Sequence, residues 1–202
     1  MSEIIDRQRT IYLVRHGMHA EVGKALSGRS EISLNDHGQT QAYALADSFS
    51  SVPLLSVHTS PRVRALETTD PLARSRELLP TIAPALDEID FGAFTGRRFD
   101  QLAGDAAWTR WNAERDTARC PGGETMAEAV ERAYGYVERI PSALTPAVCV
   151  THCDIIRGIV ARLLGLPFAR MFALECAPAS VTTLAFSATG ATLVTLNAAC
   201  PR

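Results

Sequence analysis

Hydrophobic residues follow two patterns along this chain. Short runs rich in β-branched residues occupy positions 11–14, 54–58 and 147–152, which is typical of buried strands. Helical spacing of apolar residues follows each run and predicts helices over 36–49, 61–77, 124–140 and 154–165. We expect Asn35 or Asp36 to cap the first helix, Pro61 to take the first position of the second, and Gly165 to end the last.

The remaining segments complete the predicted order of elements. Residues 81–88 indicate an edge strand, since Pro84 suits an edge better than a centre. A final hairpin is expected over 179–185 and 191–197 around Thr189-Gly190. Strands that alternate with helices predict an α/β fold: a three-layer sandwich with a mostly parallel central sheet flanked by helices. We expect one domain over residues 1–202.

Residues 93–121 do not fit this alternation, and they predict a short helical insertion that forms a lid over a site. The insertion carries Trp108 and Trp111. These aromatic residues line the lid or serve as packing anchors, which is the commoner use of tryptophan.

Composition narrows the class of protein. The 202 residues are 47% hydrophobic and 21% charged, with a net charge of −2, as in ordinary globular proteins. This balance argues against a nucleic-acid or anionic membrane surface. No apolar run has membrane-spanning length, and residues 1–9 lack the apolar centre of a signal peptide, so we expect a cytoplasmic protein. The five cysteines have no metal-type spacing, which favours reduced thiols and no zinc site: Cys120, Cys149, Cys153, Cys176 and Cys200.

Two of the predicted central strands end at a histidine. The first is followed by Arg15-His16-Gly17, and the other ends at His152. Carboxyl ends of parallel strands meet at one edge of a sheet, where open α/β folds bind ligands. Arg62 and Arg64 fall in the first turn of a helix, where a cation opposes the helix dipole unless an anion binds there. These residues together predict an anion site that contains a nucleophile.

Five motifs support this prediction and resemble the histidine phosphatase superfamily, the phosphoglycerate-mutase-like phosphatases. They cover nearly the whole chain in the order of the family. The motifs are Leu13-Val-Arg15-His16-Gly17 with Ser27-Gly28 and Leu34-x-x-x-Gly38-x-x-Gln41-Ala42; Ser60-Pro-Arg-Val-Arg64-Ala65-x-x-Thr68; Leu86-x-Glu88-x-x-Phe91-Gly92-x-Phe94-Thr95-Gly96; Pro121-Gly-Gly-Glu124; and Val150-Thr-His152-x-x-x-Ile156-Arg157.

The resemblance implies a role for each site residue. His16 would attack phosphorus and form a phosphohistidine, which water then hydrolyses. Arg15 and Arg64 would hold the phosphoryl oxygens, and His152 would be a charged donor to the same oxygens. Glu88 would protonate the leaving oxygen and then activate water, which requires a raised pKa. No metal and no cofactor are expected.

Other positions are expected to contact the substrate or depart from the family pattern. Gly17, Ser27, Gly28 and the backbone amide of Cys153 are expected substrate contacts. His19 and Val22 replace the usual polar residues of the first loop, and His19 is either a substitute donor or a surface histidine. Cys153-Asp154 replaces Gly-Gly, and the Cys153 thiol, beside a cationic cluster, is expected to have a lowered pKa and to be oxidisable. Arg62 is an extra substrate contact or, as the simpler interpretation, a surface arginine.

The sequence therefore favours hydrolysis of a small phosphomonoester, with the substrate and inorganic phosphate as partners and a monomer or homodimer as the assembly. The compact insertion fits a phosphatase better than a mutase, whose site must exclude water. α-Ribazole phosphatases have a similar size and insertion and give one candidate substrate. Two alternatives stay open: mutase-type phosphoryl transfer, and a non-catalytic protein that binds a phosphorylated ligand.

Overall fold

The central sheet is the frame of the molecule. The computed structural model describes residues 8–199, in which six strands form one sheet of order β3-β2-β4-β1-β5-β6. The strands β1, β2, β3 and β4 run parallel to one another, whereas β5 is antiparallel to both of its neighbours, β1 and β6. Their bounds are β1 (Arg9–Arg15), β2 (Ser56–Thr59), β3 (Thr81–Ile82), β4 (Ala147–Thr151), β5 (Val181–Ser187) and β6 (Gly190–Ala198). The prediction of a mostly parallel sheet is confirmed.

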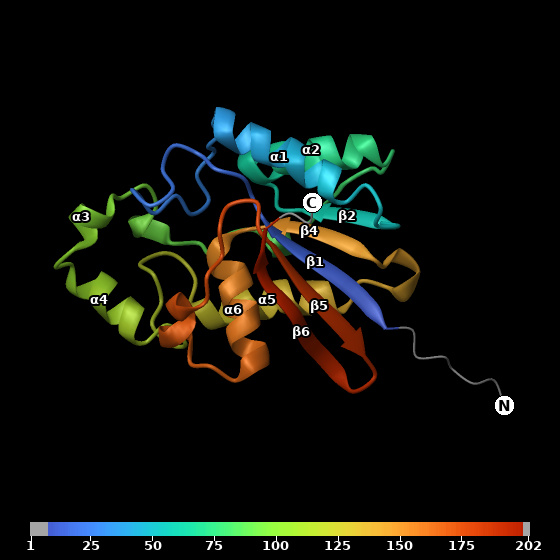
Figure 1. Cartoon of the computed structure of the whole chain (residues 1–202). Helices are drawn as coiled ribbons and strands as arrows, with labels where there is room; N and C mark the ends of the chain where they lie inside the picture. The colour runs from blue at the N-terminus through green and yellow to red at the C-terminus, as the bar shows by residue number, and fades with distance from the viewer. Residues whose placement is uncertain (1–7, 200–202) are drawn as a thin grey trace.

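Helices cover both faces of this sheet. In Figure 1, α1 and α2 lie on one face and α5 and α6 on the other, so the molecule has the three layers that the sequence predicts. The short helices α3 and α4 lie beyond one end of the sheet, where residues 93–121 extend from the sandwich. The bounds are α1 (Asp36–Ser48), α2 (Val63–Ser75), α3 (Phe99–Leu102), α4 (Ala106–Ala113), α5 (Met126–Glu138) and α6 (Cys153–Leu164).

Alternation along the central strands creates the two cores. Leu13 and Cys149 are fully buried in the cluster that packs on α5 and α6, whereas Val14 and Val150 belong to the cluster under α1 and α2. Successive side chains of a strand point to opposite faces of the sheet, so a central strand must be apolar at every position. The uninterrupted apolar runs at 11–14 and 147–150 follow from burial on both faces.

Two of three helix ends follow the predicted signals. The side chain of Asn35 accepts a hydrogen bond from the Gly38 amide at 2.9 Å and caps α1. Gly165 has the left-handed φ of 64° that ends α6. The start of α2 differs, because Arg62 is the N-cap and Pro61 precedes the helix.

The predicted strand over 81–88 is wrong in its length. Only Thr81–Ile82 pair with β2, and the chain then turns into a short 3₁₀ helix, Pro84–Leu86. Proline lacks a backbone N–H, so Pro84 cannot extend the ladder, but its fixed φ suits the first position of a helical turn. Consequently Glu88 lies on a loop and not at a strand end.

Two predictions concern residues outside the described range. The expected absence of a signal peptide at 1–9 concerns mainly residues 1–7, and the expected reduced thiol of Cys200 lies beyond residue 199. Cys120, Cys149, Cys153 and Cys176 are free thiols, as predicted. Within residues 8–199, none of the helices is long and apolar enough to cross a membrane.

Candidate active site

The carboxyl ends of β1 and β4 bring the two histidines together. These strands are parallel neighbours, with Arg15 opposite Thr151 in register, so the residues that follow, His16 and His152, leave the sheet side by side. Their ring centroids are 5.2 Å apart. The two rings are therefore neighbours, as predicted, but only His16 lines the cavity described next, and His152 is completely buried behind it.

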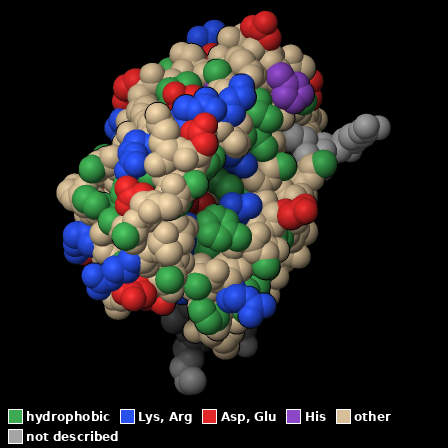
Figure 2. Space-filling view, turned by 90° about the vertical axis from the view of Figure 1, so that its left-hand side faces the viewer, with side chains coloured by type: hydrophobic (Ala, Val, Ile, Leu, Met, Phe, Trp, Pro, Cys, Tyr) green, Lys and Arg blue, Asp and Glu red, His purple; other side chains and the backbone are tan. Residues whose placement is uncertain are grey.

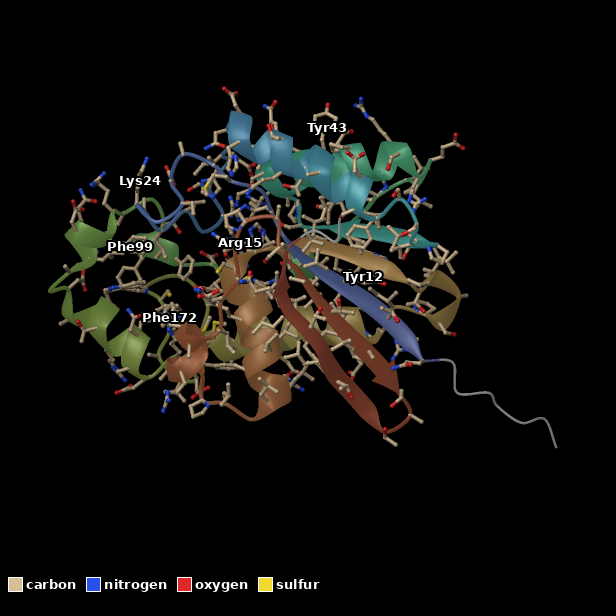
Figure 3. All side chains as sticks on the ribbon, viewed as in Figure 1. Tyr12, Arg15, Lys24, Tyr43, Phe99 and Phe172 are labelled. Carbon is tan, nitrogen blue, oxygen red and sulfur yellow. The ribbon has the colours of Figure 1, made fainter. Side chains whose placement is uncertain are left out.

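A cavity of about 330 Å³ opens beside His16. Figure 2 shows this face of the molecule hollowed, with hydrophobic and basic side chains around the opening. Figure 3 shows Arg15 near the end of the sheet, with Phe99 and Phe172 on the side of α3 and α4. All three residues line the cavity, so the insertion supplies part of its wall, as a lid would.

The tautomer of His16 is fixed by its neighbour. Its Nδ1 atom lies 2.8 Å from the carbonyl oxygen of Gly17, which can only accept a hydrogen bond. Nδ1 therefore carries the hydrogen, and Nε2 keeps its lone pair. Burial, followed by the charges of Arg64 and Arg15, lowers the pKa of His16 well below its ordinary value. A neutral imidazole with an available Nε2 lone pair is the form that a nucleophile requires.

Arg64 is held rigidly at the start of α2 and lines the cavity. Only 1% of its surface is exposed, and its guanidinium donates to the carbonyl oxygens of Gly28 at 2.5 Å and Ser30 at 2.9 Å. Arg15 lines the same cavity, and its Nη1 donates to the carbonyl oxygen of Cys176 at 2.6 Å. The structure thus brings both predicted phosphate-binding arginines into the same cavity as His16.

His152 is neutral in this structure, and its role as a charged donor to a phosphoryl group stays a prediction. Its Nδ1 lies 3.1 Å from the Arg64 guanidinium, which can only donate, so Nδ1 accepts. The hydrogen is therefore on Nε2, which donates to the hydroxyl of Ser60 at 2.7 Å. Complete burial, with the charges of Arg64 and His16, lowers the pKa of His152 well below its ordinary value. A phosphoryl dianion beside the ring would oppose this shift.

Glu88 has the raised pKa that the sequence prediction required. It lines the cavity with 7% of its surface exposed. Burial, reinforced by the charge of Asp154, raises its pKa to about 8, although the Ile89 amide donates to its carboxyl group at 3.0 Å. At neutral pH the carboxyl group is mostly protonated and can donate a proton.

The predicted substrate contacts divide into two sets. Ser27, Gly28 and Cys153 line the cavity, whereas the amide of Gly17 donates to the Thr68 hydroxyl at 2.9 Å. The expected reactivity of the Cys153 thiol is wrong: the thiol donates a hydrogen bond to the Cys176 carbonyl oxygen at 3.7 Å, and its interaction with the Cys176 side chain, followed by burial, raises the pKa of Cys153. The same interaction lowers the pKa of Cys176, although burial opposes this shift. The thiol of Cys153 therefore stays protonated.

Two further alternatives are decided by burial. His19 is 4% exposed, lines the cavity, and has a ring centroid 5.2 Å from that of His16, so the surface interpretation is wrong. Arg62 forms ion pairs with Glu31 at 2.6 Å and Asp87 at 3.2 Å, with only 20% of its side chain exposed. It is thus a structural ion-pair residue and not a solvated surface arginine.

Sequence reasoning missed a second charged group in the cavity wall. Arg115 is 1% exposed, and its guanidinium lies between the rings of Trp111 at 4.0 Å and Phe172 at 4.4 Å. Asp154 lies 3.8 Å from Arg115 and 3.9 Å from Arg157. Of Arg115, Asp154 and Arg157, only Arg157 is a residue of the five family motifs. No local pattern distinguishes Arg115 from the other charged residues of the insertion. Trp108 lines the cavity, while the buried Trp111 is a packing anchor, so both uses of tryptophan occur.

The comparisons with known proteins agree with this geometry. The chain matches the histidine phosphatase superfamily (branch 1) over residues 11–199. The chain belongs to this superfamily. Among its curated relatives is a protein named "Probable phosphoglycerate mutase GpmB" from Cronobacter sakazakii, 30% identical over 166 residues that cover 78% of this chain and 75% of the relative.

Solved structures give the same family. A mycobacterial glucosyl-3-phosphoglycerate phosphatase is 26% identical with a TM-score of 0.82, over 95% of this chain and 100% of the other. An α-ribazole phosphatase from Shigella flexneri is 24% identical with a TM-score of 0.84, over 96% of this chain and 98% of the other, and it shows the shared fold. Phosphoryl hydrolysis or transfer is the chemistry of such relatives, and the phosphatases among them support an assignment of this chain as a phosphatase.

Proposed function

We propose that this protein hydrolyses a small phosphomonoester through a phosphohistidine on His16. The observation that supports this most is the neutral His16 ring, which donates a hydrogen bond from Nδ1 to the Gly17 carbonyl oxygen at 2.8 Å. This leaves Nε2 free to attack in a cavity that Arg15 and Arg64 also line. A protein that only binds phosphate needs neither a neutral nucleophile nor a protonated acid in the same cavity.

The reaction would take place in two steps. In the first step the Nε2 atom of His16 attacks phosphorus and the bond from phosphorus to the leaving oxygen breaks, while the Glu88 carboxyl group gives that oxygen its proton. Arg15 and Arg64 hold the phosphoryl oxygens and stabilise the charge that develops on them. The alcohol leaves, and Nε2 carries the phosphoryl group.

In the second step the ionised Glu88 takes a proton from water, and the water oxygen attacks phosphorus. The bond from phosphorus to Nε2 breaks, and inorganic phosphate leaves. No net proton is gained or lost by Glu88 over the cycle. The reaction as proposed needs no metal, because Arg15 and Arg64 supply the positive charge.

The experiment measures phosphate release from p-nitrophenyl phosphate and from a panel of sugar, nucleotide and carboxylated phosphomonoesters, in EDTA. We expect the wild type to release phosphate and His16→Ala to release none. The wild type should also give a trapped phosphohistidine that is labile in acid and stable in base. Activity that survives in His16→Ala would contradict the nucleophile.

The curated relative named as a phosphoglycerate mutase favours a second candidate, transfer of the phosphoryl group between two hydroxyl groups. The same panel distinguishes it. Mutase activity would give an isomeric phosphomonoester from phosphoglycerate faster than it gives inorganic phosphate. Saturable binding of phosphate analogues without turnover on any substrate would instead indicate a binding protein.

A further inference from the structure

The backbone that carries Glu88 belongs to no strand or helix. It lies between the 3₁₀ helices Pro84–Leu86 and Gly92–Phe94, where no ladder of backbone hydrogen bonds fixes the chain. A proton donor must nevertheless be held within a fraction of an ångström of the leaving oxygen. Side chains from other parts of the sequence therefore have to position this loop.

Two arginines converge on the carbonyl oxygen of Glu88. Arg132, on α5, donates to it from Nη2 at 2.9 Å, and Arg29, from the first loop, donates from Nε at 3.0 Å. The Nη1 atom of Arg132 also donates to the carbonyl oxygens of Ala85 and Asp87, both at 2.8 Å. Three backbone carbonyl groups, those of Ala85, Asp87 and Glu88, are thereby bound to Arg132 of α5.

Glu124 joins these two arginines. Its Oε1 accepts from Nε of Arg132 at 3.0 Å, and its Oε2 lies 3.0 Å both from Nη2 of Arg132 and from Nη2 of Arg29. The same Oε2 accepts from the amide of Asp90 at 3.0 Å. Burial opposes ionisation of Glu124, but hydrogen bonds from Arg132 and Asp90 and the charge of Arg29 keep its pKa below the ordinary value. Its carboxylate is charged at neutral pH.

Gly123, before Glu124, and Gly92, in the loop after Glu88, permit this contact. A Cβ atom on Gly123 would lie 2.1 Å from the carbonyl oxygen of Asp90, and one on Gly92 would lie 2.1 Å from that of Pro121. The amide of Glu124 also donates to the Asp90 carbonyl oxygen at 2.8 Å. The two loops thus touch backbone to backbone, which places the Glu124 carboxylate against the loop of Glu88.

We propose that Glu124 is a positioning residue for the proton donor Glu88, acting through Arg29 and Arg132; this rests on the proposed function. Glu124 has a second effect, because it balances two cations that bind the Glu88 backbone. The other charged or titratable groups that face Glu88 are Asp87 beside it, Arg64 of α2, and Cys153 and Asp154 of α6. Without the Glu124 charge, Arg29 and Arg132 would favour ionisation of Glu88.

The test compares Glu124→Gln with the wild type on two substrates. Glycerol phosphate has a poor leaving group that needs a proton, whereas p-nitrophenolate leaves without one. We expect Glu124→Gln to lower kcat/KM on glycerol phosphate by 10-fold to about 10²-fold, since a displacement of 1 Å can cost that much. It should change kcat/KM on p-nitrophenyl phosphate less than about 3-fold, because kcat/KM reports only the first step and p-nitrophenolate needs no proton. The alkaline limb of the pH profile should move to lower pH.

Glu131→Gln is the matched control, because it removes an exposed carboxylate on α5 that pairs with Arg162 away from the cavity. It should match the wild type on both substrates. Arg29→Gln, which removes one of the two donors to the Glu88 carbonyl, should reproduce the substrate-dependent loss in a milder form. If circular dichroism shows that Glu124→Gln does not fold, Arg29→Gln still tests the positioning role.

Glu88→Gln separates this inference from the proposed function. If Glu88→Gln shows the substrate-dependent loss and both Glu124→Gln and Arg29→Gln lack it, the positioning role is overturned and the proposed function stands. If Glu88→Gln itself reduces kcat/KM equally on both substrates, Glu88 is not the proton donor and both proposals fall. Equal losses in folded Glu124→Gln on the two substrates would also overturn the positioning role.

Discussion

The guanidinium of Arg64 donates to the Nδ1 atom of His152 at 3.1 Å, and this contact sets the protonation of the histidine. A ring nitrogen that accepts a hydrogen bond cannot also carry a proton, so His152 is the neutral tautomer with hydrogen on Nε2. The Ser60 hydroxyl accepts that hydrogen at 2.7 Å. The candidate site therefore holds its positive charge on arginines and keeps both facing histidines neutral.

Histidine titration tests this charge distribution. His16 and His152 have pKa values well below 6.5, and burial with the charges of Arg64 and Arg15 lowers the pKa of His19 to about 4. We expect the C2 proton shifts of these three rings to stay constant between pH 7.5 and pH 5.5 in ligand-free protein. Titration of His152 near pH 6.5 would contradict the tautomer.

The same shifts predict how stability depends on pH. The unfolded chain binds protons to these histidines as the pH falls through 6.5, whereas the folded chain does not. The free energy of unfolding should therefore decrease as the pH falls below 6.5. Chemical denaturation at several pH values measures this slope, and His152→Gln should reduce it.

Glu88 gives the opposite dependence. Its pKa is raised from 4.5 to about 8, so between these values the folded chain keeps a proton that the unfolded chain has lost. Glu88 should therefore contribute less to the free energy of unfolding as the pH rises from 4.5 to 8, and kcat/KM on alkyl phosphates should fall above pH 8, because the acid form is required. Glu88→Gln should remove both this contribution and the alkaline limb, so that the opposite contribution of the histidines is measured alone in this variant. An alkaline limb unchanged in Glu88→Gln would contradict the assignment.

The thiol of Cys153 should be unreactive. Its hydrogen bond with Cys176 and its burial raise its pKa above that of an ordinary thiol, although the residue lines the cavity. At pH 8 we expect iodoacetamide to alkylate Cys153 at least about 10-fold more slowly than free cysteine, because only the thiolate reacts. Peptide mass spectrometry measures the rate, with Cys153→Ser as the assignment control. Alkylation as fast as that of free cysteine would show that the thiol is ionised.

Close backbone packing fixes the loop after His16. A Cβ atom on Gly38 would lie 2.0 Å from the carbonyl oxygen of Met18, and one on Gly17 would lie 2.8 Å from that of Gly38. We expect Gly38→Ala to destabilise the protein by about 1–3 kcal/mol, as overpacking does, and to lower kcat by displacing His16. Thermal melting and phosphate release measure the two effects. Gly23→Ala, where a Cβ would meet no atom within 4 Å but φ is 76°, separates backbone strain from packing.

Much of this molecule was determined by the sequence alone. The apolar runs at 11–14 and 147–150 specified two central strands because burial on both faces leaves no polar position. Parallel pairing of those strands was enough to predict that His16 and His152 meet, and Arg64 followed from the start of the next helix. Asn35 and Gly165 marked helix ends through purely local chemistry.

Tertiary structure decided what depends on contacts between distant residues. The protonation of His152 follows from Arg64, 88 residues away along the chain, and the reversed order of the Cys153 and Cys176 pKa values follows from a pair 23 residues apart. Arg115 entered the cavity wall only because Trp111 and Phe172 enclose its guanidinium. A linear sequence shows the charge of each group, but burial and the partner across space determine its pKa, and both arise only when the chain folds.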